Sequence, residues 1–573
     1  MSQNNENTAH PTTEQLLELV NQRLRLELPE PIYSETSVKD VWIEMSDGVK
    51  LFANLCLPEG SGKWPVIIMR NPYQSNDPAD NGNSQLLGRR FAQYGYAFLY
   101  CHARGIARSE GDFLPFVNER TDGRDTIDWV AKQDWCDGNI GCYGASYLGH
   151  VQWSIADYHH PALKTLFISV FGINSYNTFY RRGMFRQDPW TEWACQMMEA
   201  NRYKSHEEKA EQVRKGLEVF PQAELGKQLT GDDCDWYNTW ITNISETDPY
   251  WASGFWGELT ESLSNIEIPL FLHGGWFDVF IRTQIESWRA LPEETRRKSR
   301  FVVGPWHHGG APSGDLDYPN EARFGLLQIR EALEWFDFQL KGKPYQSKLG
   351  VIEAYSIGDN QWKVWENDIC PETEEVYYLT PDNKLTNSSV SDGEISFTYD
   401  PQNPTKVLSF GLAKGSVFHP EPGTREGVVS FISDPLTEEL YLVGKIQAEL
   451  YVSSSASATA FAINILETFE DGKSVNIIED ITDIRWRGER EQVPYTPNSI
   501  VKLKIDVSDI TWMLKKGSRL RIDISSSLHP LYHAHPNTEE NWAVATERVT
   551  AKQTIYCGTE YPSKLVLPIN RGY

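Results

Sequence analysis

The chain has 573 residues, a formal net charge of −25 at pH 7 and an aromatic content of 12%. This length exceeds what one hydrophobic core usually organises, so roughly two to four domains are expected. The strong negative charge argues against nucleic acid as a partner, because that binding needs clustered lysine and arginine side chains.

The sequence offers no sign of a membrane, secretory or disulfide-rich protein. Residues 1–10 are polar, and no apolar run approaches the length of a membrane span. The eight cysteines include no Cys-x-x-Cys pair, which favours reduced thiols over disulfides or a zinc site. We therefore expect a cytoplasmic protein with no membrane partner and no cofactor, and the sequence leaves a homo-oligomer open.

The N-terminal half predicts an α/β domain. Residues 1–30 read as a packing arm with a short amphipathic helix, and Val41–Met45 and Val49–Cys56 as an antiparallel hairpin. Short apolar runs then alternate with helical stretches, which is typical of a parallel sheet covered on both faces. The predicted strands are Val66–Met69, Ala97–Tyr100, Ile140–Tyr143, Leu166–Val170, Leu270–Leu272 and Phe301–Val303.

Two further domains follow from changes in pattern. Residues 174–265 lose the strand rhythm and are rich in tryptophan and tyrosine, which predicts a helical cap inserted into the α/β domain (31–173 and 266–348). From residue 349 to 573, alternating apolar and polar residues predict an all-β, jelly-roll-like sandwich.

A nucleophile elbow is predicted where the strand ending near Tyr143 meets a helix. Gly144-Ala145-Ser146 places a serine on a tight strand-to-helix turn, although the second glycine of the common motif stands one position late, at Gly149. Without context, the same string also fits a serine that only caps a helix.

The acid and the base of a catalytic triad follow in the order used by α/β-hydrolases. Asp278 lies just after the strand Leu270–Leu272, and His307 and His308 lie just after Phe301–Val303. All these candidates emerge at the carboxyl edge of the predicted sheet, where open α/β folds build their sites. Metal binding by the adjacent histidines is disfavoured, because neighbours in sequence point apart and no further ligand motif is present.

An oxyanion hole needs two donors. The backbone N–H of Tyr147 is one, and the loop Arg70-Asn71-Pro72-Tyr73 is expected to supply the other.

Several motifs together resemble the CocE/NonD hydrolases, the relatives of cocaine esterase, α-amino acid ester hydrolase, glutaryl-cephalosporin acylase and X-Pro dipeptidyl peptidase. The motifs are Tyr100–Gly111, Glu119–Trp129, Gly144–Gly149, Gly275–Asp278 and Gly304–His308. The resemblance implies Ser146 as nucleophile, Asp278 as acid, His308 as base, and the Tyr73 hydroxyl with the Tyr147 amide as oxyanion donors.

The sequence thus predicts a serine hydrolase that cleaves a small-molecule ester or amide through an acyl-enzyme. An X-Pro dipeptidyl peptidase or an α-amino acid ester hydrolase/β-lactam acylase is the alternative, and a carbohydrate-binding protein with a vestigial hydrolase is disfavoured by the intact Ser/Asp/His set. Trp190, Phe185 and Arg282 are expected to contact substrate.

The sequence after Asp278 predicts the type of acyl group. Val279-Phe280-Ile281-Arg282 contains no acid, and the early cap offers aromatics and arginines. We therefore expect neutral or anionic acyl groups, with Arg181, Arg182 or Arg282 as carboxylate partners. Glu192 and Asp248 are the cap acids able to reverse this preference if they reach the site.

Overall fold

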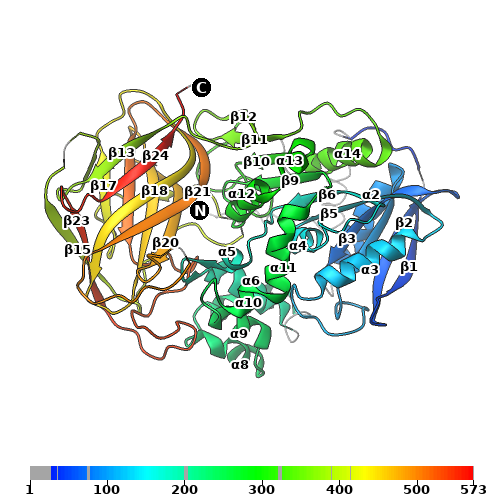
Figure 1. Ribbon diagram of the computed structural model, residues 1–573, viewed down its shortest axis with the longest axis horizontal. Helices are drawn as coiled ribbons and strands as arrows, with labels where there is room; N and C mark the ends of the chain where they lie inside the picture. Colours follow the sequence, from blue (N-terminus) through cyan, green and yellow to red (C-terminus); the bar gives the residue numbers. More distant parts are fainter. Residues whose placement is uncertain are drawn as a thin grey trace, which may run out of the picture.

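The computed structural model describes residues 28–34, 36–73, 78–198, 204–320, 326–388, 390–412, 414–488 and 490–571. Most of the expected N-terminal arm, including its helix, lies outside these residues. The α/β domain, the cap and the β domain lie side by side, with the β domain at one end of the molecule (Figure 1).

A ten-stranded sheet forms the α/β domain, in the order β1-β2-β4-β3-β5-β6-β9-β10-β11-β12. The strands from β4 to β11 along this path run parallel, and the pairs β1·β2, β2·β4 and β11·β12 are antiparallel. The apolar runs of the sequence become its buried central strands, so the predicted fold class is confirmed. The strands are β1 (Thr36–Glu44), β2 (Lys50–Pro58), β3 (Trp64–Asn71), β4 (Ala97–His102), β5 (Cys136–Ala145), β6 (Leu163–Ser169), β9 (Leu270–Gly275), β10 (Arg300–Gly304), β11 (Val351–Ser356) and β12 (Gln361–Glu366).

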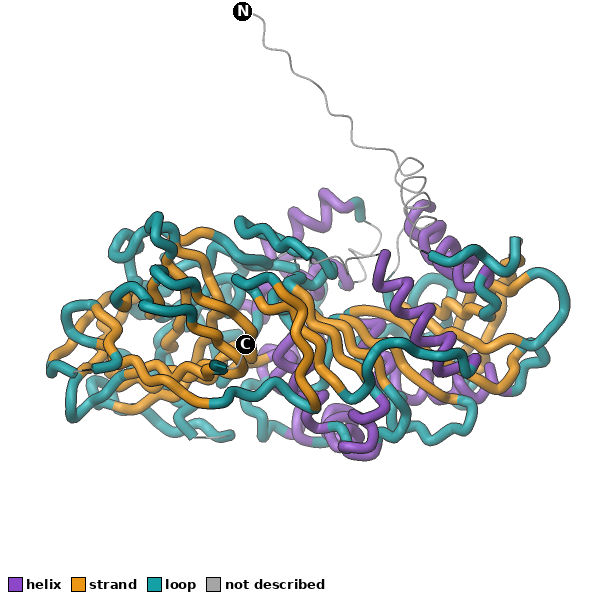
Figure 2. The backbone as a smooth tube through the Cα atoms, turned by 90° about the horizontal axis from the view of Figure 1, so that it is seen from above, coloured by secondary structure: helices purple, strands orange, loops and turns teal. Residues whose placement is uncertain are grey.

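Helices cover both faces of this sheet, as Figure 2 shows from above. Helices α2 and α14 pack on one face through an aromatic core that includes Phe91 and Phe336, and α3, α4 and α12 pack on the other. Burial on both faces explains why the central strands read as continuous apolar runs. The helices are α2 (Pro78–Gln93), α3 (Glu119–Ala131), α4 (Tyr147–Trp153), α12 (Ile281–Ala290), α13 (Glu293–Lys298) and α14 (Leu326–Lys341).

The sheet continues beyond residue 349, where we expected the β sandwich to begin. Strand β11 pairs in parallel with β10, and β12 closes the edge as a hairpin partner. Alternating residues in this stretch are compatible with either sheet, so the pattern alone did not reveal which sheet the strands join.

The cap is mainly helical, as predicted, and covers the carboxyl edge of the parallel strands. Its aromatic side chains pack on one another; for example, the ring centroids of Phe179 and Trp190 are 4.1 Å apart. The cap elements are α5 (Ser175–Phe179), β7 (Tyr180–Arg181), β8 (Met184–Phe185), α6 (Gln187–Met197), α7 (His206–Gly216), η2 (Gln222–Glu224), α8 (Leu225–Thr230), α9 (Asp235–Thr242), α10 (Pro249–Ala252), α11 (Gly254–Ser262) and η3 (Leu263–Asn265).

The C-terminal domain is built from β-strands, and long antiparallel pairs such as β18·β21 and β19·β20 dominate it. Its buried apolar side chains join those of the α/β domain and the cap in one hydrophobic cluster. Its strands are β13 (Thr373–Leu379), β14 (Lys384–Thr386), β15 (Gly393–Tyr399), β16 (Phe418–His419), β17 (Val429–Ser433), β18 (Leu440–Ser454), β19 (Ala460–Thr468), β20 (Ser474–Asp483), β21 (Val501–Leu514), β22 (Arg519–Ser525), β23 (Ala551–Cys557) and β24 (Lys564–Ile569). Among the described helices of the whole chain, none has the length and apolar character that a membrane crossing requires.

Candidate active site

Ser146 lies on a strained turn between β5 and α4. Its φ of 59° and ψ of −127° are unusual for a residue with a side chain. A Cβ on Gly144 would lie 2.5 Å from the Leu148 Cβ, and a Cβ on Gly149 would lie 2.9 Å from the Phe171 Cβ. The late second glycine of the motif is therefore required by the close approach of the segment after β6.

The loops after β9 and β10 are joined by backbone hydrogen bonds. Trp276 N–H donates to Gly304 O at 2.9 Å, and Phe277 N–H donates to Trp306 O at 3.0 Å. Gly275 is needed at this contact, because a Cβ there would lie 2.2 Å from Trp306 O. Parallel strands end at one edge of the sheet, and these bonds bring the acid-bearing and histidine-bearing loops together above it.

Ser146, His308 and Asp278 form a hydrogen-bonded chain. His308 Nε2 lies 2.8 Å from Ser146 Oγ, and His308 Nδ1 lies 2.8 Å from Asp278 Oδ1. The Asp278 side chain is buried, and its Oδ1 also accepts from Phe280 N–H at 3.2 Å. The arrangement orients the imidazole so that one nitrogen faces the serine hydroxyl and the other faces the carboxylate.

His307 points elsewhere, although it neighbours His308 in sequence. Its ring Nδ1 accepts a hydrogen bond from Gly309 N–H at 2.8 Å, and its backbone N–H donates to Ala311 O at 2.7 Å. Partial burial lowers the pKa of its imidazole. These contacts make His307 part of the turn that presents His308.

Tyr73 and Tyr147 lie beside the serine at the places expected for oxyanion donors. Burial of the hydroxyl raises the pKa of Tyr73, while hydrogen bonds with the Trp193 and Ser146 side chains and the Tyr147 backbone amide oppose the rise. Trp193 Nε1–H donates to the Tyr73 hydroxyl at 3.3 Å. This bond occupies an acceptor position of the hydroxyl and leaves its proton available to another oxygen.

A cavity of about 280 Å³ opens in front of the serine and the histidine. Trp190, predicted as a substrate contact, lines it. Other side chains in its wall come from the α/β domain, the cap and the β domain. Because these residues are far apart in sequence, their place in one cavity could not be predicted from sequence order. The lining residues are Tyr73, Phe116, Ser146, Tyr147, Phe171, Pro189, Trp190, Glu192, Trp193, Gln196, Phe280, His308 and Leu412.

Glu192 is the acidic side chain of this cavity. Burial raises the pKa of its carboxyl, an effect that His308 and a hydrogen bond from Gln196 Nε2 at 3.1 Å oppose. Glu192 follows Trp190 by two residues on α6, outside the stretch from which we predicted the acyl preference. We expected a cavity lined mainly by aromatic residues and arginines; the aromatic residues are present, but the charged residue found in the lining is Glu192.

Phe185 and Arg282, the other two predicted substrate contacts, do not line the cavity. Phe185 is fully buried and stacks on Trp542 of the β domain, with ring centroids 5.3 Å apart. An apolar residue in a predicted cap carries no signal that separates a cavity wall from a domain interface, and the interface is where Phe185 packs.

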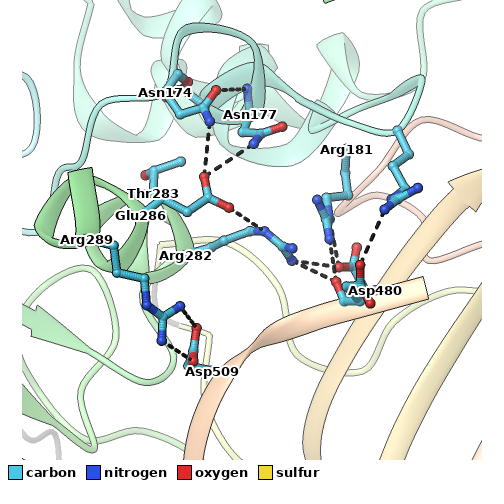
Figure 3. A network of polar contacts seen from close by, with 12 residues as sticks. Asn174, Asn177, Arg181, Arg282, Thr283, Glu286, Arg289, Asp480 and Asp509 are labelled. Carbon is cyan, nitrogen blue, oxygen red and sulfur yellow. Dashed lines mark hydrogen bonds and ion pairs between the residues drawn. The ribbon is translucent and has the colours of Figure 1, made fainter. Parts of the chain in front are cut away.

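Arg282 lies at the junction of α12, the cap and the β domain (Figure 3). Its Nε donates to Glu286 Oε1 at 3.1 Å, and its Nη1 donates to Asp480 Oδ2 at 3.1 Å. The other two arginines that we expected to meet substrate carboxylates are also paired there, since Arg181 contacts Asp480 and Arg182 contacts Asp506. These guanidinium groups serve the junction between domains.

Comparison with known proteins agrees with this architecture. Residues 47–310 match the family model "X-Pro dipeptidyl-peptidase (S15 family)", and residues 350–566 match "X-Pro dipeptidyl-peptidase C-terminal non-catalytic domain". The cocaine esterase of Rhodococcus sp. (strain MB1 Bresler) is 27% identical over 92% of this chain and 98% of its own.

Two solved structures share the fold over nearly the whole chain. An aminopeptidase from a marine sediment Thaumarchaeota archaeon matches with a TM-score of 0.81 and 20% identity, covering 95% of this chain and 98% of its own. An α-amino acid ester hydrolase matches with a TM-score of 0.78 and 22% identity over the same shares. Both domain matches and the full-length relative lead to one conclusion: the chain is a hydrolase that belongs to the CocE/NonD family.

Proposed function

We propose that this hydrolase cleaves carboxylic esters or amides of small molecules through an acyl-enzyme intermediate on Ser146. The observation that carries the proposal is the pair of 2.8 Å contacts that His308 makes, with Ser146 Oγ on one side and Asp278 Oδ1 on the other. In this geometry the histidine accepts the serine proton as the oxygen attacks the substrate carbonyl carbon.

The remaining steps use the same groups. The Tyr73 hydroxyl and the Tyr147 amide donate to the oxygen that becomes negatively charged in the tetrahedral intermediate. The protonated histidine gives its proton to the departing alcohol or amine, and Asp278 stabilises the imidazolium meanwhile. Water, activated by the same histidine, then attacks the acyl-enzyme and releases the acid.

Fluorophosphonate labelling with mass spectrometry of the peptides tests the nucleophile. We expect one label on Ser146, none in Ser146→Ala, and a loss of turnover on the order of a million-fold in Ser146→Ala and His308→Ala. His307→Ala is the matched control and is expected to lose far less. More than about a tenth of parental activity in folded Ser146→Ala protein would contradict the proposal, given the expected loss.

A second proposal concerns the acyl group, and Glu192 favours it. The cavity combines a partly buried carboxylate with several aromatic faces, a chemistry that suits an ammonium group through ion pairing and cation–π contact. Among the described residues that line the cavity, none is an arginine or lysine able to receive an anionic acyl group. We therefore propose amine-bearing acyl groups as the preferred substrates, in place of the neutral or anionic groups expected from sequence.

A matched pair of esters, with and without an ammonium group on the same acyl chain, tests this preference. The parent is expected to favour the ammonium ester in kcat/KM by about tenfold, corresponding to about 1.4 kcal/mol of transition-state binding. Glu192→Gln should remove most of this difference, whereas Glu211→Gln, which changes an exposed carboxylate on α7 outside the cavity, should retain it. Equal kcat/KM values for the two esters in the parent would refute the preference for amine-bearing acyl groups and favour neutral ones.

A further inference from the structure

Phe116 lines the cavity and has a backbone conformation that phenylalanine rarely adopts. Its φ is 73°, in the left-handed region, and its side chain is almost completely buried. A non-glycine residue in this region stores strain that the surrounding structure must offset. Its ring contacts aromatic rings from α4 and the cap, with centroid distances of 4.7–5.8 Å, namely Tyr147, His150, Phe179, Trp190, Trp193, Trp240 and Trp256.

A hydrogen bond connects the Phe116 backbone amide to the residue that follows Ser146. Phe116 N–H donates to the Tyr147 hydroxyl at 2.8 Å. The same hydroxyl donates to Glu119 Oε1 at 2.9 Å, so it acts as acceptor and donor at once. Tyr147 directly follows Ser146, so its hydroxyl connects the elbow to the cavity wall.

Glu119 fixes this hydroxyl, and Arg70 fixes Glu119. The carboxylate lies 2.7 Å from Arg70 Nη2, and Arg70 Nη1 also donates to Glu119 O at 2.8 Å. Both side chains are about 5% exposed or less. Burial raises the pKa of Glu119 and Arg70 opposes the rise, so this charge is held in place by a specific partner. A buried ion pair aimed at a single phenol restricts where that phenol can lie.

From this chain of contacts we infer that the Tyr147 side chain is a positioning residue for acyl selectivity: Arg70 and Glu119 hold its hydroxyl, which keeps the Phe116 ring in the cavity wall. This role is separate from that of the Tyr147 backbone amide in the oxyanion hole. It rests on the proposed function, since selectivity is measured through the acyl-enzyme reaction.

The experiment compares Tyr147→Phe with the parent on p-nitrophenyl benzoate and p-nitrophenyl acetate. An acetyl group is small and is expected to make little contact with Phe116, whereas a benzoyl ring is expected to pack against it. Loss of one aromatic contact corresponds to about a three- to tenfold decrease in the ratio of kcat/KM for benzoate to that for acetate. Phe116→Ala should lower the same ratio at least as much.

A double-mutant cycle decides whether Tyr147 acts through Phe116. In a Phe116→Ala background, Tyr147→Phe should change the ratio by less than about twofold, because the ring it positions is already gone. The same decrease in both backgrounds, or an unchanged ratio in the single variant, would overturn the inference. Should Tyr147→Phe fail to fold, Glu119→Asp takes its place in the cycle, since it keeps the charge opposite Arg70 but shortens the reach to the phenol.

Tyr96→Phe is the matched control. The Tyr96 hydroxyl also donates to a carboxylate, Asp337 Oδ1 at 2.7 Å, but on the face of the sheet covered by α2 and α14. This variant should lose thermal stability without a change in the benzoate-to-acetate ratio. Fluorophosphonate labelling of every variant separates the two levels of failure: absence of label in the parent contradicts the proposed function, and unchanged selectivity in fully labelled protein contradicts only this inference.

Discussion

Asp480→Ala is expected to destabilise the junction between the α/β domain, the cap and the β domain more than any exposed substitution. The Asp480 carboxylate is 4% exposed and accepts from Arg181 Nε at 2.7 Å and from Arg282 Nη1 at 3.1 Å (Figure 3). Without it, Arg282 keeps Glu286 as an ionic partner, whereas Arg181 is left with a hydrogen bond to the backbone carbonyl of Asp506 and no ion pair to another described residue.

The expected magnitude follows from this loss of compensation. Removing one partner of a buried ion pair costs about 3–5 kcal/mol, because the remaining charge stays buried. At roughly 2–4 °C per kcal/mol for a domain of 150–250 residues, Tm should fall by about 6–20 °C. Scanning calorimetry at one fixed scan rate measures the change, since large proteins often unfold irreversibly.

Asp471→Ala is the matched control for this experiment. Asp471 lies in the same domain, but its side chain is 57% exposed and its contact with Lys473 spans 3.5 Å. Exposed pairs of this kind contribute about 1 kcal/mol or less, so a change in Tm of a few degrees at most is expected. A Tm of Asp480→Ala equal to that of Asp471→Ala would refute the reasoning that the junction depends on charge compensation.

Two further predictions concern the oxyanion hole and the response to pH. Tyr73→Phe should lower kcat by about 10²- to 10³-fold, and a parental kcat would return Tyr73 to a packing role. Burial raises the pKa of Asp188 to about 7 from its usual 3.8. Because the folded chain then binds this proton more strongly than the unfolded chain, Asp188 contributes a stability that declines as pH rises from about 4 to 7. Asp188→Asn should therefore gain in Tm relative to the parent between pH 5 and pH 8; a constant difference would count against a buried, protonated Asp188.

The sequence predicted the fold class and the elements that present Ser146, Asp278 and His308, and the reason is local. Each of these residues follows an apolar strand directly, and parallel strands end at a common edge, so strand order alone brings the three close together. The late glycine at position 149 also has a local cause, since α4 packs closely against Phe171.

The cavity wall was harder to predict because it depends on contacts between distant segments. Glu192 was foreseen only as an acid that would reverse the acyl preference if it reached the site. Phe185 and Trp190 are both buried aromatics of the cap, and only packing decides that Trp190 faces the cavity and Phe185 faces Trp542. Leu412 belongs to a turn-rich segment of the β domain without any sequence pattern of a binding site.

Because Leu412 lines the cavity, the candidate active site is formed by residues of all three domains. Leu412 lines the cavity, and its neighbour Gly411 donates its N–H to Asp188 Oδ2 of the cap at 2.6 Å. A chain shortened to the α/β domain and the cap would retain the three proposed triad residues but lose Leu412 from the lining of the cavity. Exchange of C-terminal domains between relatives should accordingly alter substrate preference, so recombination at this boundary offers evolution a route to new specificity without any change to Ser146, Asp278 or His308.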